Sequence, residues 1–274
     1  MRKIFLGTLT ILVIFIFGCG GAALLDAPEI TGIIFHEASV TITWQADAVI
    51  ENNVDFNGYN IYVSTDSVDL LVEDAENFNK INAIVITGNT YTTPTTLHQD
   101  SIYYVQVRTV NIDNKVGSYN SNVPFVAASP RPEFTATLSF EVYPTPDYDS
   151  CAIRFSDATI MADSAMPYSG ADMWIDWPTK FVSPNNHPQY GANSRETNFV
   201  NLGQYELDDI SEVTTEPTES NVEVDEGDLV ICMTEDSNYV KIHVDEIIPI
   251  DSSGFSVTIT YAYQNIANFP YLSP

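Results

Sequence analysis

The chain has 274 residues and is strongly acidic, with 37 Asp and Glu residues against 10 Lys and Arg residues and a formal net charge of −27. Nucleic acid is therefore a poor partner, because affinity for it depends on neutralising phosphates. Hydrophobic residues make up 45% of the chain, which suits packed domains and argues against disorder. The length allows two domains of ordinary size, and the excess of acid favours solubility.

Residues 1–18 have the pattern of an export signal. Arg2 and Lys3 precede an almost wholly apolar run over residues 4–17, which is short for a span of the bilayer. The run ends in IFGC, residues 16–19, and this sequence resembles the lipobox of bacterial lipoproteins. The resemblance implies cleavage before Cys19, lipidation of its thiol, and placement at the outer membrane or cell surface. Ordinary secretion or an uncleaved anchor helix is the alternative.

The chain holds three cysteines, and the expected anchor uses the first of them. Residues 19–27 would then form a lipidated tether, and the membrane would be a partner through two or three acyl chains, since one chain holds a protein only reversibly. Cys151 and Cys232 remain in a compartment that permits disulfides. They are a candidate disulfide pair, with two buried free thiols as the alternative.

Short runs that alternate between apolar and polar side chains follow the tether, and no long run has helical spacing. Such alternation, bounded by Asn, Asp, Gly and Pro, predicts antiparallel strands and an all-β protein of sandwich or barrel type. Two prolines in a small-residue stretch predict a linker at residues 127–133, between domains at residues 28–126 and 134–274. The predicted strands cover residues 40–44, 59–63, 103–110, 135–143, 151–155, 172–177, 229–234, 239–248 and 255–264.

Four residues of the first domain follow a family pattern. Trp44 lies in the second predicted strand, Tyr59 follows a glycine at the start of the third, and Leu97 stands six residues before Tyr103. On these residues the domain resembles a fibronectin type III domain. The resemblance implies a sandwich in which all four are structural and the Tyr103 hydroxyl bonds the backbone of the crossing loop. The acidic stretch at residues 66–80 departs from the pattern and is predicted as an extended loop or an extra edge strand.

Residues 171–176, 237–244 and 256–264 of the second domain resemble strands of HmuY-like surface lipoproteins. Some members of that group bind haem through two axial histidines, which need a shared apolar slot. His187 lies in a loop, and His243 lies on the strand face opposite Val240, Ile242 and Val244, so His243 is expected to face solvent. Because no ligand pair is visible, no cofactor and no metal site are expected.

The aromatic residues of the same domain suggest a ligand site. Trp174 and Trp177 have odd spacing, so a strand would turn them to opposite faces and place one in the core. The candidate ligand-binding residues are Trp174, Tyr190 and His187, which would present a stacking surface for a sugar or peptide. Packing in the core is the alternative for these rings. No sequence motif of a hydrolase or metalloenzyme is present, so we expect no catalysis.

These observations leave three hypotheses. The chain is predicted to be a non-catalytic binding, adhesion or scaffold lipoprotein whose partner is an extracellular protein or glycan. The alternative is a ligand-capture lipoprotein that holds haem or carbohydrate in its second domain. The third hypothesis is a passive component of the envelope or matrix.

Overall fold

The computed structural model describes residues 22–45, 47–72, 79–94, 96–142, 147–210, 212–250 and 253–271. The described chain forms four antiparallel sheets joined by short helices, which confirms the predicted all-β, sandwich-type fold. Cys19 and the expected signal lie outside the described residues. Within the described part, no helix combines the length and the apolar character that crossing a bilayer requires.

The first domain consists of two three-stranded sheets, with the strand orders β1-β2-β4 and β3-β5-β6. Alternating side chains place one face of each sheet in a shared core. The strands are β1 (Glu29–Phe35), β2 (Val40–Gln45), β3 (Phe56–Ser64), β4 (Thr90–Thr92), β5 (Tyr103–Asn111) and β6 (Val126–Ala128). Two short helices, α1 (Ala48–Glu51) and η1 (Ser67–Leu71), lie in its loops, so the start of the acidic stretch at 66–80 forms a 3-10 helix rather than a strand.

The core of the first domain is built around Trp44 and Tyr59, which are both fully buried. Their rings meet edge to face, with centroids 5.3 Å apart. Val105 and Val107 of β5 pack in the same core from the facing sheet. Trp44 and Tyr59 thus have the structural role that the sequence predicted.

The hydrogen bond predicted between the Tyr103 hydroxyl and the crossing loop is also present. The hydroxyl of Tyr103, at the start of β5, accepts a hydrogen bond of 2.9 Å from the backbone N–H of His98. Leu97, in the same crossing loop, is half-buried against the core. The hydroxyl therefore satisfies a loop donor while the ring is partly buried, which fixes the crossing loop over the end of the sandwich.

The second domain has two five-stranded sheets, with the strand orders β12-β14-β15-β16-β7 and β13-β11-β10-β8-β9. Its long strands are β7 (Glu133–Glu141), β12 (Thr197–Gln204), β14 (Asp228–Thr234), β15 (Tyr239–Pro249) and β16 (Gly254–Tyr263). Its short strands are β8 (Ala152–Arg154), β9 (Thr159–Met161), β10 (Met173–Asp176), β11 (Lys180–Val182) and β13 (Asn221–Glu223). Its short helices are η2 (Phe155–Asp157), η3 (Asp163–Ala165), α2 (Met166–Ser169), η4 (Pro184–Asn186) and η5 (Gly191–Asn193).

The segment that joins the two domains is buried rather than exposed. Ser129, Pro130, Arg131 and Pro132 lie between β6 and β7, and none of them is appreciably accessible to solvent. The backbone N–H of Arg131 donates to the carbonyl of His36 in the first domain, at 3.0 Å. The residues that the sequence marked as a linker therefore form a packed junction.

After β16 the chain returns to the first domain. Phe269 is buried in the core of that domain, and Ile266 and Tyr271 pack against the same core. Asn265 also donates to the carboxylate of Asp100, at 3.1 Å. The end of the described chain thus belongs in part to the first core, although the sequence assigned it to the second domain.

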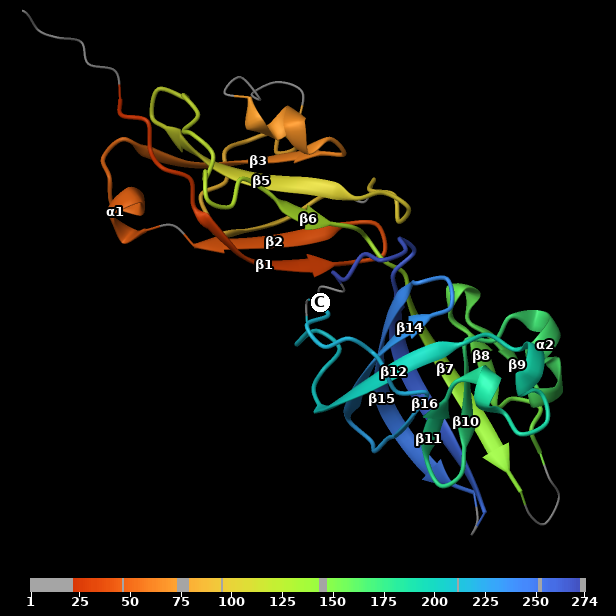
Figure 1. Cartoon of the computed structure of the whole chain (residues 1–274). Helices are drawn as coiled ribbons and strands as arrows, with labels where there is room; N and C mark the ends of the chain where they lie inside the picture. The colour runs from red at the N-terminus through yellow and green to blue at the C-terminus, as the bar shows by residue number, and fades with distance from the viewer. Residues whose placement is uncertain are drawn as a thin grey trace, which may run out of the picture.

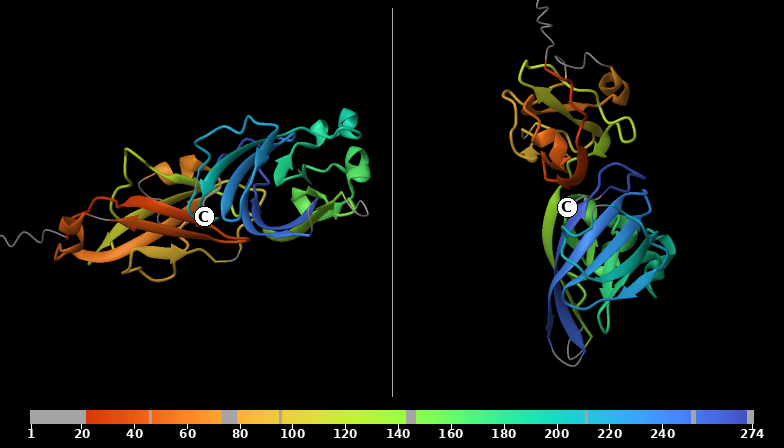
Figure 2. Two further views of the ribbon diagram at one scale, coloured as in Figure 1. Left: turned by 90° about the horizontal axis from the view of Figure 1, so that it is seen from below. Right: turned by 90° about the vertical axis from the view of Figure 1, so that its left-hand side faces the viewer.

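The two domains lie end to end and give an elongated molecule (Figures 1 and 2). The first described residues lie at the far end of the first domain, while β8, β9 and α2 lie at the opposite end of the molecule (Figure 1). The second domain therefore occupies the end away from the N-terminal segment.

Cys151 and Cys232 are free thiols buried in the second core, so the disulfide considered from the sequence is not formed. Cys232 belongs to β14 in one sheet, whereas Cys151 immediately precedes β8 in the other. The Cys151 thiol donates instead to the carbonyl of Tyr148, at 3.2 Å.

Candidate functional site

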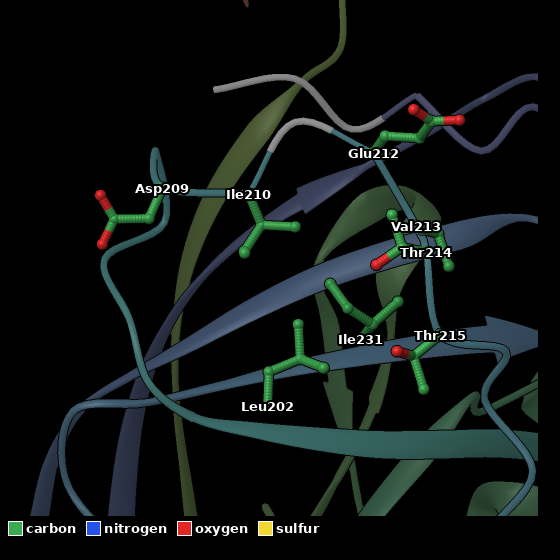
Figure 3. Close-up of a pocket in the computed structure, with 8 residues that line it drawn as sticks. All are labelled: Leu202, Asp209, Ile210, Glu212, Val213, Thr214, Thr215 and Ile231. Atoms are coloured by element: carbon green, nitrogen blue, oxygen red, sulfur yellow. The ribbon is translucent and has the colours of Figure 1, made fainter.

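Two cavities of about 250 Å³ lie in the second domain, and their linings differ in kind. The first lies under residues 209, 210 and 212–215, which we call the acidic segment, and there Leu202, Ile210, Val213 and Ile231 point toward one another (Figure 3). The carboxylates at its margin point away from this apolar group (Figure 3). It is a gap in the packing of a loop against a sheet, because it lacks polar groups that converge on it.

The second cavity combines aromatic rings with carboxylates, and we call it the aromatic cavity. It draws on β7, β10, η3 and the loops that precede β8 and follow η4. Its walls include the rings of Phe140, Tyr148, Trp174 and His187 and the carboxylates of Asp163 and Asp176. A concave site with apolar walls and a few convergent polar groups is the usual form of a small-molecule site.

One tryptophan is buried and the other exposed, as expected, but only Trp174 lies in β10, because the strand ends at Asp176 and Trp177 belongs to the turn that follows. Trp174 is 4% exposed and its indole N–H donates to the carbonyl of Ser183, at 3.3 Å, whereas Trp177 is 43% exposed. Trp174 therefore serves both of the roles weighed from the sequence, since it packs in the core and also forms a wall of the aromatic cavity.

His187 lies between Trp174 and Tyr190. Its ring meets Trp174 edge to face at 4.5 Å between centroids and stacks on Tyr190 at 5.1 Å. Its Nδ1 accepts hydrogen bonds from the backbone N–H groups of Gln189 and Tyr190, at 3.2 and 3.1 Å. The structure therefore brings the three predicted residues together, with Trp174 and His187 at the cavity and Tyr190 behind the imidazole.

The hydrogen bonds fix the tautomer of His187. Because Nδ1 accepts two bonds, the neutral ring carries its proton on Nε2, which lies 3.6 Å from Oδ2 of Asp163. Burial lowers the pKa of His187, although the carboxylates of Asp163 and Asp176 oppose that effect. The imidazole is therefore neutral at pH 7 and presents an N–H donor beside a carboxylate.

Cys151 also lines the aromatic cavity, near Asp163 and His187, in an arrangement that superficially suggests a nucleophile. Burial raises the pKa of its thiol to about 12, with a further contribution from the charge of Asp163. A reactive cysteine needs its thiolate, so this thiol is inert at neutral pH.

The strand β15 corrects one expectation. Val240, Ile242 and Val244 are buried as predicted, but the opposite face is covered as well. His243 is half-buried and its Nδ1 lies 2.7 Å from Oδ1 of Asp245, and Lys241 is fully buried. The acidic segment around residue 210 folds over this face, so alternation along the strand marked the two faces correctly without showing that both would be covered.

Sequence reasoning missed several groups at the aromatic cavity. Phe140, Tyr148, Asp163 and Asp176 come from four separate segments. The first three belong to no motif, and Asp176 lies in the stretch 171–176 without having been proposed as a ligand-binding residue. Among the described residues, no group of three or more His, Cys, Asp or Glu side chains is placed to hold a metal ion. The signal that could have found the missed residues is the run of acids and aromatics flanking each short strand from residue 148 to residue 177.

Comparison with known proteins adds nothing to this geometry. No model of a protein family matches the chain, and the search of curated proteins found no similar sequence.

Proposed function

We propose that this chain is an exported, lipid-anchored binding protein of the cell surface that has no catalytic activity. The observation that carries the proposal is the aromatic cavity, a concave site in the domain that lies away from the N-terminal segment. The buried junction and the inserted Phe269 support a rigid presentation of that site. The ligand of this protein would lie outside the cell.

The first domain supports the proposal as a spacer of fibronectin type III character. Its two-sheet core, the contact between Trp44 and Tyr59 and the corner at Tyr103 are all consistent with that family pattern. A spacer of this kind carries no ligand by virtue of its fold alone.

The chemistry at the cavity supports a binding role over catalysis. The Cys151 thiol, whose pKa burial raises to about 12, provides no nucleophile, and His187 uses Nδ1 to accept two backbone hydrogen bonds. Transfer of a proton or an acyl group would need a base within reach of an activated nucleophile.

Haem capture has little support from the same geometry. Axial ligation by His187 would cost either its backbone hydrogen bonds or its N–H contact with Asp163. Met161, Met166 and Met173 are buried in the core, and the cavity is smaller than the ~300–1,000 Å³ typical of sites for larger ligands.

The anchor is tested by mass spectrometry and fractionation of the native chain. We expect a mature N-terminus at Cys19 that carries acyl groups, and we expect Cys19→Ser to shift the protein from the membrane to the soluble fraction. A native chain that retains Met1, or that carries an unmodified Cys19, would contradict the proposal.

The ligand site is tested by calorimetric titration of the full chain, purified in detergent, with an organic ammonium ion, a monosaccharide and haem. We expect binding of at least one small ligand to be abolished by Gln189→Trp, because residue 189 is exposed at the cavity and a large ring there would fill it. Asn193→Trp, an exposed position in η5 away from the lining, is the matched control and should bind like the wild type. Binding by Gln189→Trp at wild-type strength would argue against this site.

A further inference from the structure

The aromatic cavity has ring-lined walls that suit a bound cation. Phe140 and Tyr148 lie with ring centroids 5.3 Å apart, and Trp174 and His187 form a second pair at 4.5 Å. Aromatic faces attract ammonium and guanidinium groups, and tryptophan does so most strongly. These rings come from both sheets of the second domain and from the loops between them, so the cavity is part of the packed fold.

Two carboxylates complete the lining. The side chain of Asp163 is 17% exposed, and Asp176 is half-buried at the end of β10. Within the described ranges, neither carboxylate forms an ion pair with a lysine or arginine. Asp163 faces the N–H of His187, and Asp176 accepts a hydrogen bond of 2.8 Å from the backbone N–H of Trp177, so a cation in the cavity would supply the counter-charge that both carboxylates lack.

The basic residues near the cavity are engaged elsewhere. Lys180 faces Asp176 across the ladder of β10 and β11, but its ammonium lies 3.5 Å from Glu223. The imidazole of His187 offers only a neutral N–H at pH 7, so it does not replace a cation.

We propose that the aromatic cavity binds a small organic ammonium ion, held between its aromatic faces and the carboxylates of Asp163 and Asp176. The inference rests on the proposed function, which places the ligand site in this cavity. The volume of about 250 Å³ limits the ligand to one smaller than the molecules that pockets of ~300–1,000 Å³ accept. The net charge of −27 would also raise the local concentration of cations around the chain.

The proposal is tested with choline and with 3,3-dimethylbutan-1-ol, which has the shape of choline but no charge. Calorimetric titration of the full chain should show choline binding at least about tenfold more tightly than the neutral alcohol. Asp163→Asn and Asp176→Asn should each weaken choline binding about tenfold, which corresponds to about 1.4 kcal/mol. Asp149→Asn, an exposed carboxylate next to Tyr148 that does not line the cavity, changes the net charge equally and should leave binding unchanged.

The outcomes separate this inference from the proposed function. Equal binding of choline and the neutral alcohol, or wild-type choline binding by both Asn variants, would overturn the ammonium proposal and leave a binding protein for another ligand. Binding of glucose without binding of choline would also overturn the ammonium proposal and leave a binding protein for another ligand. If choline, the neutral alcohol and glucose all fail to bind, the ammonium proposal fails together with the assignment of this cavity as the ligand site. Thermal unfolding of each Asn variant checks that the fold is retained.

Discussion

Phe269→Ala is expected to lower the free energy of unfolding by about 3 to 5 kcal/mol, the usual cost of removing a buried phenylalanine ring. The ring lies in the core of the first domain, 5.2 Å between centroids from that of Tyr271. The backbone around it is held by the second domain, because the N–H of Asn268 donates to the carbonyl of Ser237 at 2.8 Å. The ring therefore adds a buried apolar contact to the hydrogen bonds that join the two domains.

The same substitution should change the cooperativity of unfolding. We expect the wild type to unfold in one calorimetric transition and Phe269→Ala to unfold in two, because the domains lose a buried apolar contact that helps to couple them. Small-angle scattering should show a larger radius of gyration for the variant. Tyr168→Ala removes a ring that is 90% exposed and should change neither measurement. If Phe269→Ala unfolds in a single transition and its free energy of unfolding falls by less than about 1 kcal/mol, the inserted ring does not couple the domains.

Local alternation was sufficient to predict most long strands. Tyr103 and the residues after it occupy β5, and residues 239–248 match nearly all of β15. Such strands have one apolar face, and this pattern is visible in the sequence. The strand β12 was missed because TNFVNLGQ interrupts its apolar positions with asparagine and glycine.

Long-range packing could not be read from alternation. Lys241 and His243 lie on the face of β15 that the sequence assigned to solvent, and that face is covered by a segment about thirty residues away along the chain. Phe269 lies in a short tail with no periodicity, so nothing local indicated that it would enter the other domain. Burial at such positions depends on the final arrangement of the loops.

The candidate site shows the same division. The sequence indicated Trp174, His187 and Tyr190 because aromatic and histidine side chains gather in one region, and the structure brings them into contact. Asp163 and Phe140 were not predicted, because a cavity made from separate segments leaves no spacing in the sequence.

Lys241→Met is expected to raise the free energy of unfolding at pH 7 by about 1 to 4 kcal/mol, as replacement of a buried charge by an apolar side chain often does. Lys241 is fully buried, and its Nζ donates to the carbonyl of Ile210 at 2.8 Å. That carbonyl belongs to the segment that covers the outer face of β15 (Figure 3). Methionine would keep the packing of the stem and remove the cost of desolvating the ammonium.

The pH dependence follows from the same lysine. Burial, together with the nearby charge of Arg131, lowers the pKa of Lys241 to about 7, against the opposing charges of Asp208, Glu133 and Asp209. Between pH 7 and the ordinary lysine pKa of 10.5, the unfolded chain binds more protons than the folded chain, so stability rises with pH. The rise is bounded at about 1.4 kcal/mol for each pH unit.

Urea denaturation at pH 7, 8 and 9 in constant salt measures this slope. The measurement stops near pH 9 because burial raises the pKa values of the Cys151 and Cys232 thiols. Above that pH these thiols ionise more readily in the unfolded chain than in the folded chain, which lowers stability as the pH rises. The slope should be present in the wild type and in Lys180→Met, whose ammonium is partly exposed beside Glu223, and absent in Lys241→Met. If Lys241→Met kept the wild-type slope, the pH dependence would have to come from other groups and not from the buried ammonium.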